Sequence, residues 1–117
     1  MTVLPGVTSI GDFAFRGCER ITSVTLPDGV TTLGTQAFYG CKGITSIVFP
    51  DSVKEIGPDA FMGCENPTSN TIPDSVTSID DSAFPENRNT SLVIYCHENF
   101  YAQTYAKDNR IAYELIE

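Results

Sequence analysis

Basic residues are scarce in this sequence: seven lysines and arginines stand against fifteen aspartates and glutamates, and the formal net charge is -8. Nucleic acids and anionic membrane surfaces attract proteins through clustered lysine and arginine, so neither is expected as a partner. Histidine occurs once, as His97. A hydrolytic triad built on it would need a serine or cysteine motif that the sequence does not contain. These shortages argue against an enzyme.

Long apolar runs are missing as well. No stretch approaches the roughly 18 apolar residues that cross a bilayer, and residues 1–5 lack the basic and apolar regions of a signal peptide. Hydrophobic residues make up 41% of the chain and charged residues 19%, which is ordinary for a folded protein and argues against disorder. At 117 residues, the chain is expected to build a single core.

What the sequence does contain is a repeat with a period of 23 residues. The positions that recur with this spacing are Val7, Val30, Val53 and Val76; Ile10, Leu33, Ile56 and Ile79; the Ala-Phe pairs at 14–15, 37–38, 60–61 and 83–84; Cys18, Cys41 and Cys64; and Pro27, Pro50 and Pro73. This period falls in the range of about 20–29 residues of leucine-rich repeats, whose units each add a short strand to a parallel stack. We therefore expect a β-rich repeat solenoid with turns and short helical segments.

Each repeat is expected to form one coil of the solenoid. Residues 21–26 and 44–49 carry apolar side chains at their first, fourth and sixth positions, which predicts a strand in each. The Pro-Asp-Gly or Pro-Asp-Ser that follows favours a turn, because proline fixes its backbone and aspartate bonds to nearby amides. A second extended piece then points Val30 and Leu33 inward.

A short helical turn, capped by Thr35 or Asp12, is expected to carry the Ala-Phe pair of each repeat towards the core. The phenylalanines would then stack as a column through the interior, each covered by the next repeat. Their positions are Phe15, Phe38, Phe61 and Phe84. Stability is therefore expected to depend on contacts between neighbouring repeats.

The third repeat departs from the pattern at two core positions. Pro67 stands where other repeats have isoleucine, and Asn70 stands where they have valine or isoleucine. A buried asparagine without a partner costs about 1–3 kcal/mol, and proline lacks the N–H that a strand donates to its neighbour. The first strand of this repeat, which forms one rung of the stack, is therefore expected to be bulged or loosened. In the fourth repeat Pro85 and the pair at 86–87 replace the Gly-Cys turn. Neither departure creates a site.

The cysteines allow several interpretations. Four cysteines permit three disulfide pairings, but three of them, Cys18, Cys41 and Cys64, occupy identical repeat positions, which favours a column of free, buried thiols. They also lack the two-to-four-residue spacing of zinc ligands. Cys96 and His97 are adjacent and could bind a metal or act as nucleophile and base, but neighbours in an extended strand point to opposite faces. No metal or cofactor site is expected.

Two surface features are candidates for binding. Asp28, Asp51 and Asp74 form a column of like charges that could attract a cation such as calcium, although turn formation also explains them. The exposed side of the rungs is the predicted partner-binding face, because solenoids bind along such surfaces. Its residues are Ser23, Thr25, Ser46, Val48, Ser69 and Thr71, followed by Leu92 and Ile94. Serine and threonine are also ordinary solvent-facing strand residues, so this alternative stays open.

The repeat resembles the BspA-type, or treponemal-type, leucine-rich repeats, whose pattern is similar to Leu-Thr-Ser-Ile-Thr-Leu-Pro-x-x-Val-x-x-Ile-Gly-x-x-Ala-Phe-x-Gly-Cys. Residues 27–41 and 50–64 are the closest copies, and the match covers roughly residues 4–95. The tail is similar to the helix and final strand that close such arrays, and the helical spacing of residues 101, 102, 105 and 106 independently predicts a helical cap. We expect repeats over 1–95 and a C-terminal cap over 96–117. Because the repeat pattern begins within the first few residues, the chain is expected to be part of a longer array.

The resemblance implies a non-catalytic module for adhesion or protein binding in a bacterial cell-surface or secreted protein, with a host or other cell-surface protein as partner. A passive spacer or stalk within a larger protein is the second interpretation, and an enzyme is the third. Exposed rung residues would matter for binding in the first case, and no partner would exist in the second.

Overall fold

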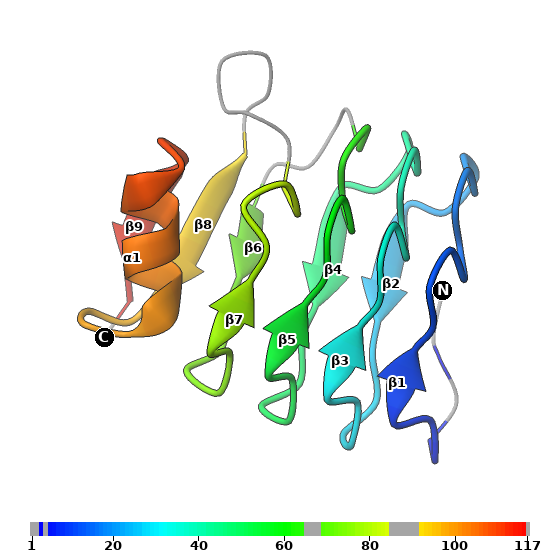
Figure 1. The fold of residues 1–117 in the computed structure, drawn as a ribbon, viewed down its shortest axis with the longest axis horizontal. Helices are drawn as coiled ribbons and strands as arrows, with labels where there is room; N and C mark the ends of the chain where they lie inside the picture. Colours follow the sequence, from blue (N-terminus) through cyan, green and yellow to red (C-terminus); the bar gives the residue numbers. More distant parts are fainter. Residues whose placement is uncertain (1–2, 4, 65–68, 85–91, 117) are drawn as a thin grey trace.

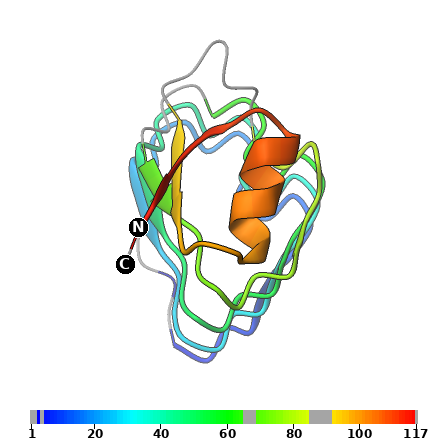
Figure 2. The ribbon, with the colours of Figure 1, turned by 90° about the vertical axis from the view of Figure 1, so that its left-hand side faces the viewer.

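The computed structural model of the chain describes residues 3, 5–64, 69–84 and 92–116. In these residues the chain forms nine short strands, all paired in parallel, and one helix (Figure 1). In chain order they are β1 (Ser9–Ile10), β2 (Ser23–Thr25), β3 (Thr32–Leu33), β4 (Ser46–Val48), β5 (Glu55–Ile56), β6 (Ser69–Thr71), β7 (Ser78–Ile79), β8 (Val93–Cys96), α1 (Tyr101–Asp108) and β9 (Ala112–Leu115). Viewed along the stack, successive coils superpose (Figure 2). The solenoid predicted from the 23-residue period is confirmed.

Each complete repeat contributes two strands, one to each of two faces. β1, β3, β5 and β7 form a four-stranded sheet, while β2 pairs with β4 and β6 pairs with β8, which pairs with β9. In the four-stranded sheet Ser9 pairs with Thr32, Thr32 with Glu55, and Glu55 with Ser78. Because every partner lies one repeat further along the sequence, one repeat makes one coil.

The predicted phenylalanine column is present. The ring centroids of Phe15 and Phe38 lie 5.2 Å apart, those of Phe38 and Phe61 lie 5.5 Å apart, and those of Phe61 and Phe84 lie 5.1 Å apart. Interplanar angles between 3° and 16° make these stacked pairs. Val30 and Leu33 are also buried, as expected. The aromatic column thus ties each coil to the coils on either side.

The segment before each phenylalanine differs from the expected short helical turn. Phe13, Gln36 and Asp59 adopt positive φ angles of 61°, 54° and 54°, which no right-handed helix accommodates. The chain therefore passes through a run of turns at these positions. Asp12 does not cap its own repeat either, since its Oδ1 accepts a hydrogen bond of 2.8 Å from the N–H of Thr35 in the next coil.

The helix expected at the C-terminal end is α1, and Figure 2 shows it lying over the end of the stack. Ala102, Tyr105 and Ala106 form its buried side, as the spacing predicts, whereas Tyr101 is exposed. The Tyr105 ring lies 6.1 Å from the ring of Phe84 at 61°, and its hydroxyl donates to the Asp80 carbonyl at 3.2 Å. Burial raises the pKa of Tyr105, so this donor stays protonated. The helix therefore covers the last ring of the column.

The loosened third rung is visible at Asn70. This side chain is buried, with 4% of its surface exposed, and its Oδ1 has no hydrogen-bond partner. Across the described residues β4 pairs with β2 and β6 pairs with β8, but β4 and β6 share no ladder. Pro67, Pro85 and the pair at 86–87 lie outside the described residues. The stacked rungs thus split into two sheets next to the buried asparagine.

Replacing Asn70 with valine is expected to raise the free energy of unfolding by about 1 kcal/mol, because the unsatisfied buried carbonyl disappears. Urea unfolding followed by circular dichroism measures the change. Thr71→Val is the matched control, since Thr71 is the exposed neighbour on the same strand and tests β propensity alone. An equal gain in both variants, or a loss in Asn70→Val, would contradict the explanation.

Candidate functional site

The predicted partner-binding face is exposed along β2 and β4. Ser23 pairs with Ser46 and Thr25 with Val48, and all four side chains are exposed. The residues between them, Val24 and Ile47, are buried with 1% and 5% of their surfaces accessible. Strand alternation therefore directs one set of side chains to solvent and the other to the core. Val48 is the most exposed large apolar side chain of the described residues, at 57%.

The face continues onto the third and fourth rungs only in part. Thr71 on β6 is exposed, as predicted, while the side chain of Ser69 lies outside what the structure describes. The expectation that Leu92 and Ile94 are exposed was wrong, since both are fully buried.

A change of register explains this error. Asn70 on β6 pairs with Ile94 on β8, a separation of 24 residues, whereas Val24 on β2 pairs with Ile47 on β4, a separation of 23. Because side chains alternate along a strand, one additional residue turns the opposite set inward. The positions that face away from the core on β8 are the partly exposed Val93 and Tyr95.

We call the β2–β4 sheet and the β6–β8–β9 sheet the two rung sheets. A hollow of about 710 Å³ opens where they meet. Its lining combines residues of β4, the end of β6 and the turns that follow, with contributions from the ends of the last two rungs. The lining residues are Ser46, Ile47, Val48, Phe49, Asp51, Thr71, Ile72, Pro73, Asp74, Ser75, His97 and Ile116. We call this hollow the rung groove. It contains Ser46, Val48 and Thr71 of the predicted face, but the repeat pattern gives no indication of a concave site.

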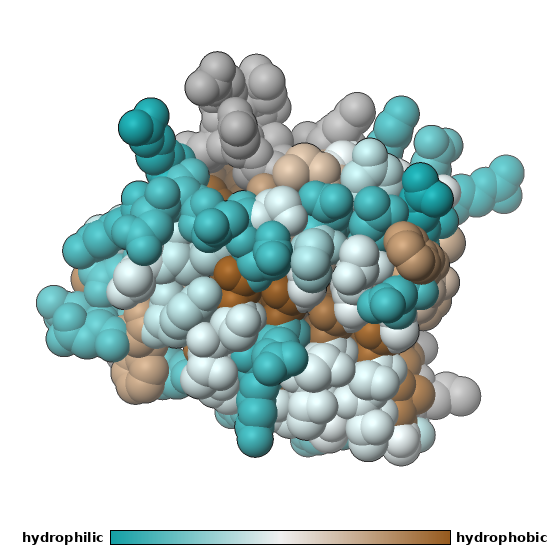
Figure 3. Space-filling view, viewed as in Figure 1, coloured by the Kyte–Doolittle hydropathy of each residue, from teal (hydrophilic) through white to brown (hydrophobic). Residues whose placement is uncertain are grey.

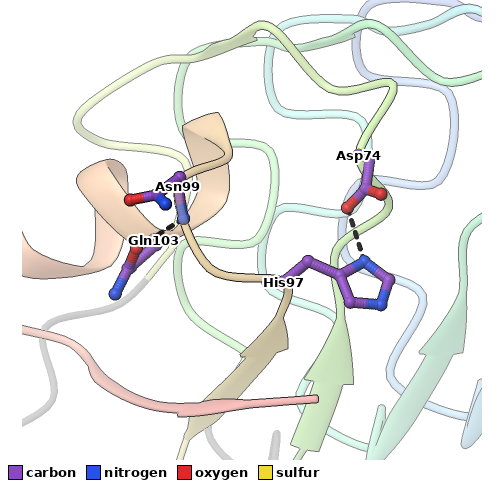
Figure 4. A network of polar contacts seen from close by, with 4 residues as sticks. All are labelled: Asp74, His97, Asn99 and Gln103. Atoms are coloured by element: carbon purple, nitrogen blue, oxygen red, sulfur yellow. Dashed lines mark hydrogen bonds and ion pairs between the residues drawn. The ribbon is translucent and has the colours of Figure 1, made fainter. Parts of the chain in front are cut away.

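The wall of the rung groove nearest the cap holds a polar pair. His97 Nδ1 lies 2.7 Å from Asp74 Oδ1, and each side chain keeps about two fifths of its surface exposed (Figure 4). Figure 4 also shows Gln103 of α1, whose Oε1 accepts from the backbone N–H of Asn99 at 2.8 Å. This bond ties the segment after His97 to the helix. The contact between His97 and Asp74 joins the turn after β6 to the residue after β8.

Cys96 does not cooperate with His97. Cys96 is fully buried, whereas His97 is partly exposed and faces Asp74, so the two side chains diverge as strand alternation predicts. Desolvation raises the pKa of the Cys96 thiol, and the nearby Asp74 carboxylate raises it further. A thiol with a raised pKa stays protonated and is a poor nucleophile. The His97 ring faces Asp74 and is not placed to accept the thiol proton.

The other cysteines form the predicted column, and all four are free. The Cys41 thiol donates to the Phe15 carbonyl at 3.0 Å, and the Cys64 thiol donates to the Phe38 carbonyl at 3.3 Å. Burial raises the pKa of Cys64 to about 12, with a smaller contribution from Cys41. Cys18 departs from the expectation, because it is only partly buried. The Cys41 and Cys64 thiols thus each link one coil to the coil before it.

The aspartate column lies in exposed turns. Asp28, Asp51 and Asp74 are all exposed, and the described part of the chain holds no group of three or more histidine, cysteine, aspartate or glutamate side chains placed to bind a metal ion. The hydrogen bonds between successive turns come instead from serine. Ser52 Oγ donates to the Val30 carbonyl and Ser75 Oγ donates to the Val53 carbonyl, both at 2.7 Å.

The face formed by β1, β3, β5 and β7 differs from the rung face. Teal and white side chains cover most of it, and brown atoms show in a row between them (Figure 3). Ser9 and Ser78 are exposed there, while Ile10 and Ile79 beside them are buried. Ser78 thus offers an exposed serine on a strand far from the rung groove. No helix in the described residues is long and apolar enough to cross a membrane.

Comparisons with solved structures find bacterial proteins of the same architecture. A leucine-rich cell surface protein from Faecalibacterium prausnitzii A2-165 is 27% identical, with a TM-score of 0.81 over 100% of this chain and 32% of its own. A leucine-rich repeat protein from Bacteroides ovatus ATCC 8483 is 38% identical, with a TM-score of 0.70 over 80% of this chain and 24% of its own. The leucine-rich repeat protein of T. pallidum is 26% identical, with a TM-score of 0.62 over 79% and 54%. The chain therefore spans only part of the length of these relatives.

The sequence itself identifies the family. No curated protein matches the chain. The sequence profile described as the BspA type leucine rich repeat region matches residues 1–111, which include every strand of the described residues except β9. The profile, the 23-residue offset between the paired strands β1, β3, β5 and β7, and the stacked phenylalanines lead to the same result. The chain belongs to the BspA-type leucine-rich repeat family.

Proposed function

We propose that this chain is a non-catalytic module that binds another protein, as part of a bacterial protein at the cell surface or outside the cell. The observation that carries the proposal is the exposed, nearly uncharged face of β2 and β4, which continues into the rung groove. Serine and threonine supply hydrogen-bonding hydroxyls there, and Val48 adds an apolar contact. Solenoids use surfaces of this extended kind to hold partners.

The remaining chemistry of the chain agrees with a role in binding. The thiols at positions 41, 64 and 96 are buried with raised pKa values, and His97 is hydrogen-bonded to a carboxylate that belongs to a turn. The surface location is supported by the description of the Faecalibacterium prausnitzii relative as a cell surface protein. Location and binding are separate parts of the proposal and require separate tests.

Location is tested by protease shaving of intact source cells. Peptides of this segment are expected in the released fraction, while a cytosolic marker stays with the cells. Release of the segment only after the cells are broken would overturn the surface location.

Binding is tested with the immobilised chain and surface proteins released from intact host or neighbouring bacterial cells. Retention of a partner by the wild-type chain is expected to fall at least tenfold in Ser46→Arg, because a long cation would fill the rung face. Ser78→Arg is the matched control, with the same charge change on the opposite face. Equal retention by both variants would place the contact elsewhere, and no retention by the wild-type chain would favour a passive spacer.

A further inference from the structure

The rung groove exists because the regular stacking of rungs stops between β4 and β6. β2 and β4 pair in register, and β6 pairs with β8, but the described residues of β4 and β6 form no ladder with one another. The groove is lined from both sides of this interruption, by Val48 and Phe49 on one side and Thr71 and Ile72 on the other. Its volume of about 710 Å³ lies within the range of about 300–1,000 Å³ that ligand pockets occupy.

The lining has apolar walls and an acidic rim. Val48 is 57% exposed, and the half-buried Ile116 adds further apolar surface. The formally charged residues among the described lining are two aspartates, Asp51 and Asp74, with no lysine or arginine beside them. The groove is therefore complementary to a side chain that joins an aliphatic stem to a positive charge.

The two aspartates are not equivalent. Asp74 is held by His97 at 2.7 Å, which fixes its carboxylate on the groove wall. Asp51 is exposed, and within the described chain it makes no hydrogen bond or ion pair. A cation that enters the groove therefore finds one positioned carboxylate and one carboxylate without a competing partner.

We propose that the rung groove receives a lysine or arginine side chain from an extended, basic segment of a protein partner. The stem packs against Val48 and Ile116, and the cationic head lies between Asp51 and Asp74. The net charge of -8 adds long-range attraction for such a segment. This inference rests on the proposed function as a binding module and specifies the chemistry of the partner.

The test measures binding of a fluorescein-labelled octapeptide of alternating arginine and valine to the full 117-residue chain. Fluorescence anisotropy gives the dissociation constant. A second octapeptide carries citrulline, which keeps the shape of arginine without its charge. Asp51→Asn is expected to weaken binding of the arginine peptide about three- to fivefold, as for a partly exposed ion pair. Asp28→Asn is the matched control, because it removes the same charge from the equivalent turn outside the groove.

The expected results are tighter binding of the arginine peptide than of the citrulline peptide, a weaker complex with Asp51→Asn, and a change of less than twofold with Asp28→Asn. Amide chemical shifts of Val48, Thr71 and Ser75 should move on titration. Equal losses of affinity in the two variants would show that the peptide binds through overall charge alone, and would overturn the inference. Equal affinity for both peptides, or shifts confined to other faces, would also overturn it.

These outcomes are separable from failure of the proposed function. If a natural partner depends on Ser46 but not on Asp51, the rung face binds and the cation site is wrong. If the peptide binds in the groove but the source cells retain this segment inside, the cation site stands and the surface location is wrong.

Discussion

Replacing Phe61 with alanine is expected to lower the free energy of unfolding by about 3–5 kcal/mol, the usual range for removing a fully packed phenylalanine. The Phe61 ring is 3% exposed and stacks between Phe38 at 5.5 Å and Phe84 at 5.1 Å, with the edge of Phe49 at 6.0 Å. Its loss leaves a cavity between two coils. Since a domain of this size is stable by about 5–15 kcal/mol, much of the stability would be lost.

Urea unfolding followed by circular dichroism measures this loss, and Phe13→Ala is the matched control. Phe13 is the same residue type two positions before the column, yet it is 53% exposed. Its replacement is expected to change stability by no more than about 0.5 kcal/mol, as for most surface substitutions. A loss below 1 kcal/mol in Phe61→Ala, or equal losses in the two variants, would show that the column does not hold the coils together.

The repeat period allowed the core to be predicted with little ambiguity. Once the valines and phenylalanines were placed in register, burial of Val30, Leu33 and Phe38 followed, because equivalent positions that have a coil on each side have similar surroundings. The buried face of α1 was also predictable from helical spacing. The turns before the phenylalanines were not, since Phe13 and Gln36 give no signal in their residue types for a positive φ.

The candidate site was predictable only where the period holds. Ser46 and Val48 are exposed as expected, but Leu92 and Ile94 are buried, because β8 pairs with β6 one residue out of the 23-residue register. Residues 85–91 precede β8 in the sequence and do not follow the repeat pattern, so no recurring position fixes the register of β8. The sequence did carry one signal for the rung groove, the polar Asn70 at a core position, where the ladder of rungs stops.

The closeness of successive coils leads to a second large effect, at Gly34. A Cβ atom at Gly34 would lie 2.7 Å from the backbone N of Asp12 and 2.9 Å from the carbonyl carbon of Gly11, and it would also meet the Asp12 carboxylate. Backbone atoms of the preceding coil cannot move aside as a flexible side chain can, and Gly34 N–H already bonds to the Ile10 carbonyl at 2.8 Å. The added methyl group must therefore push two coils apart.

Gly34→Ala is expected to lower the free energy of unfolding by up to about 3 kcal/mol, as overpacking does in a tight interior. Gly11 occupies the equivalent position one repeat earlier, and a Cβ atom there meets nothing within 4 Å. Gly11→Ala should therefore raise stability by about 0.4–1 kcal/mol, because alanine restricts the unfolded chain. Opposite signs for one substitution at two equivalent positions would establish that stacking against the preceding coil, rather than backbone conformation, requires glycine at position 34. Equal effects at both positions would assign the requirement to the local backbone.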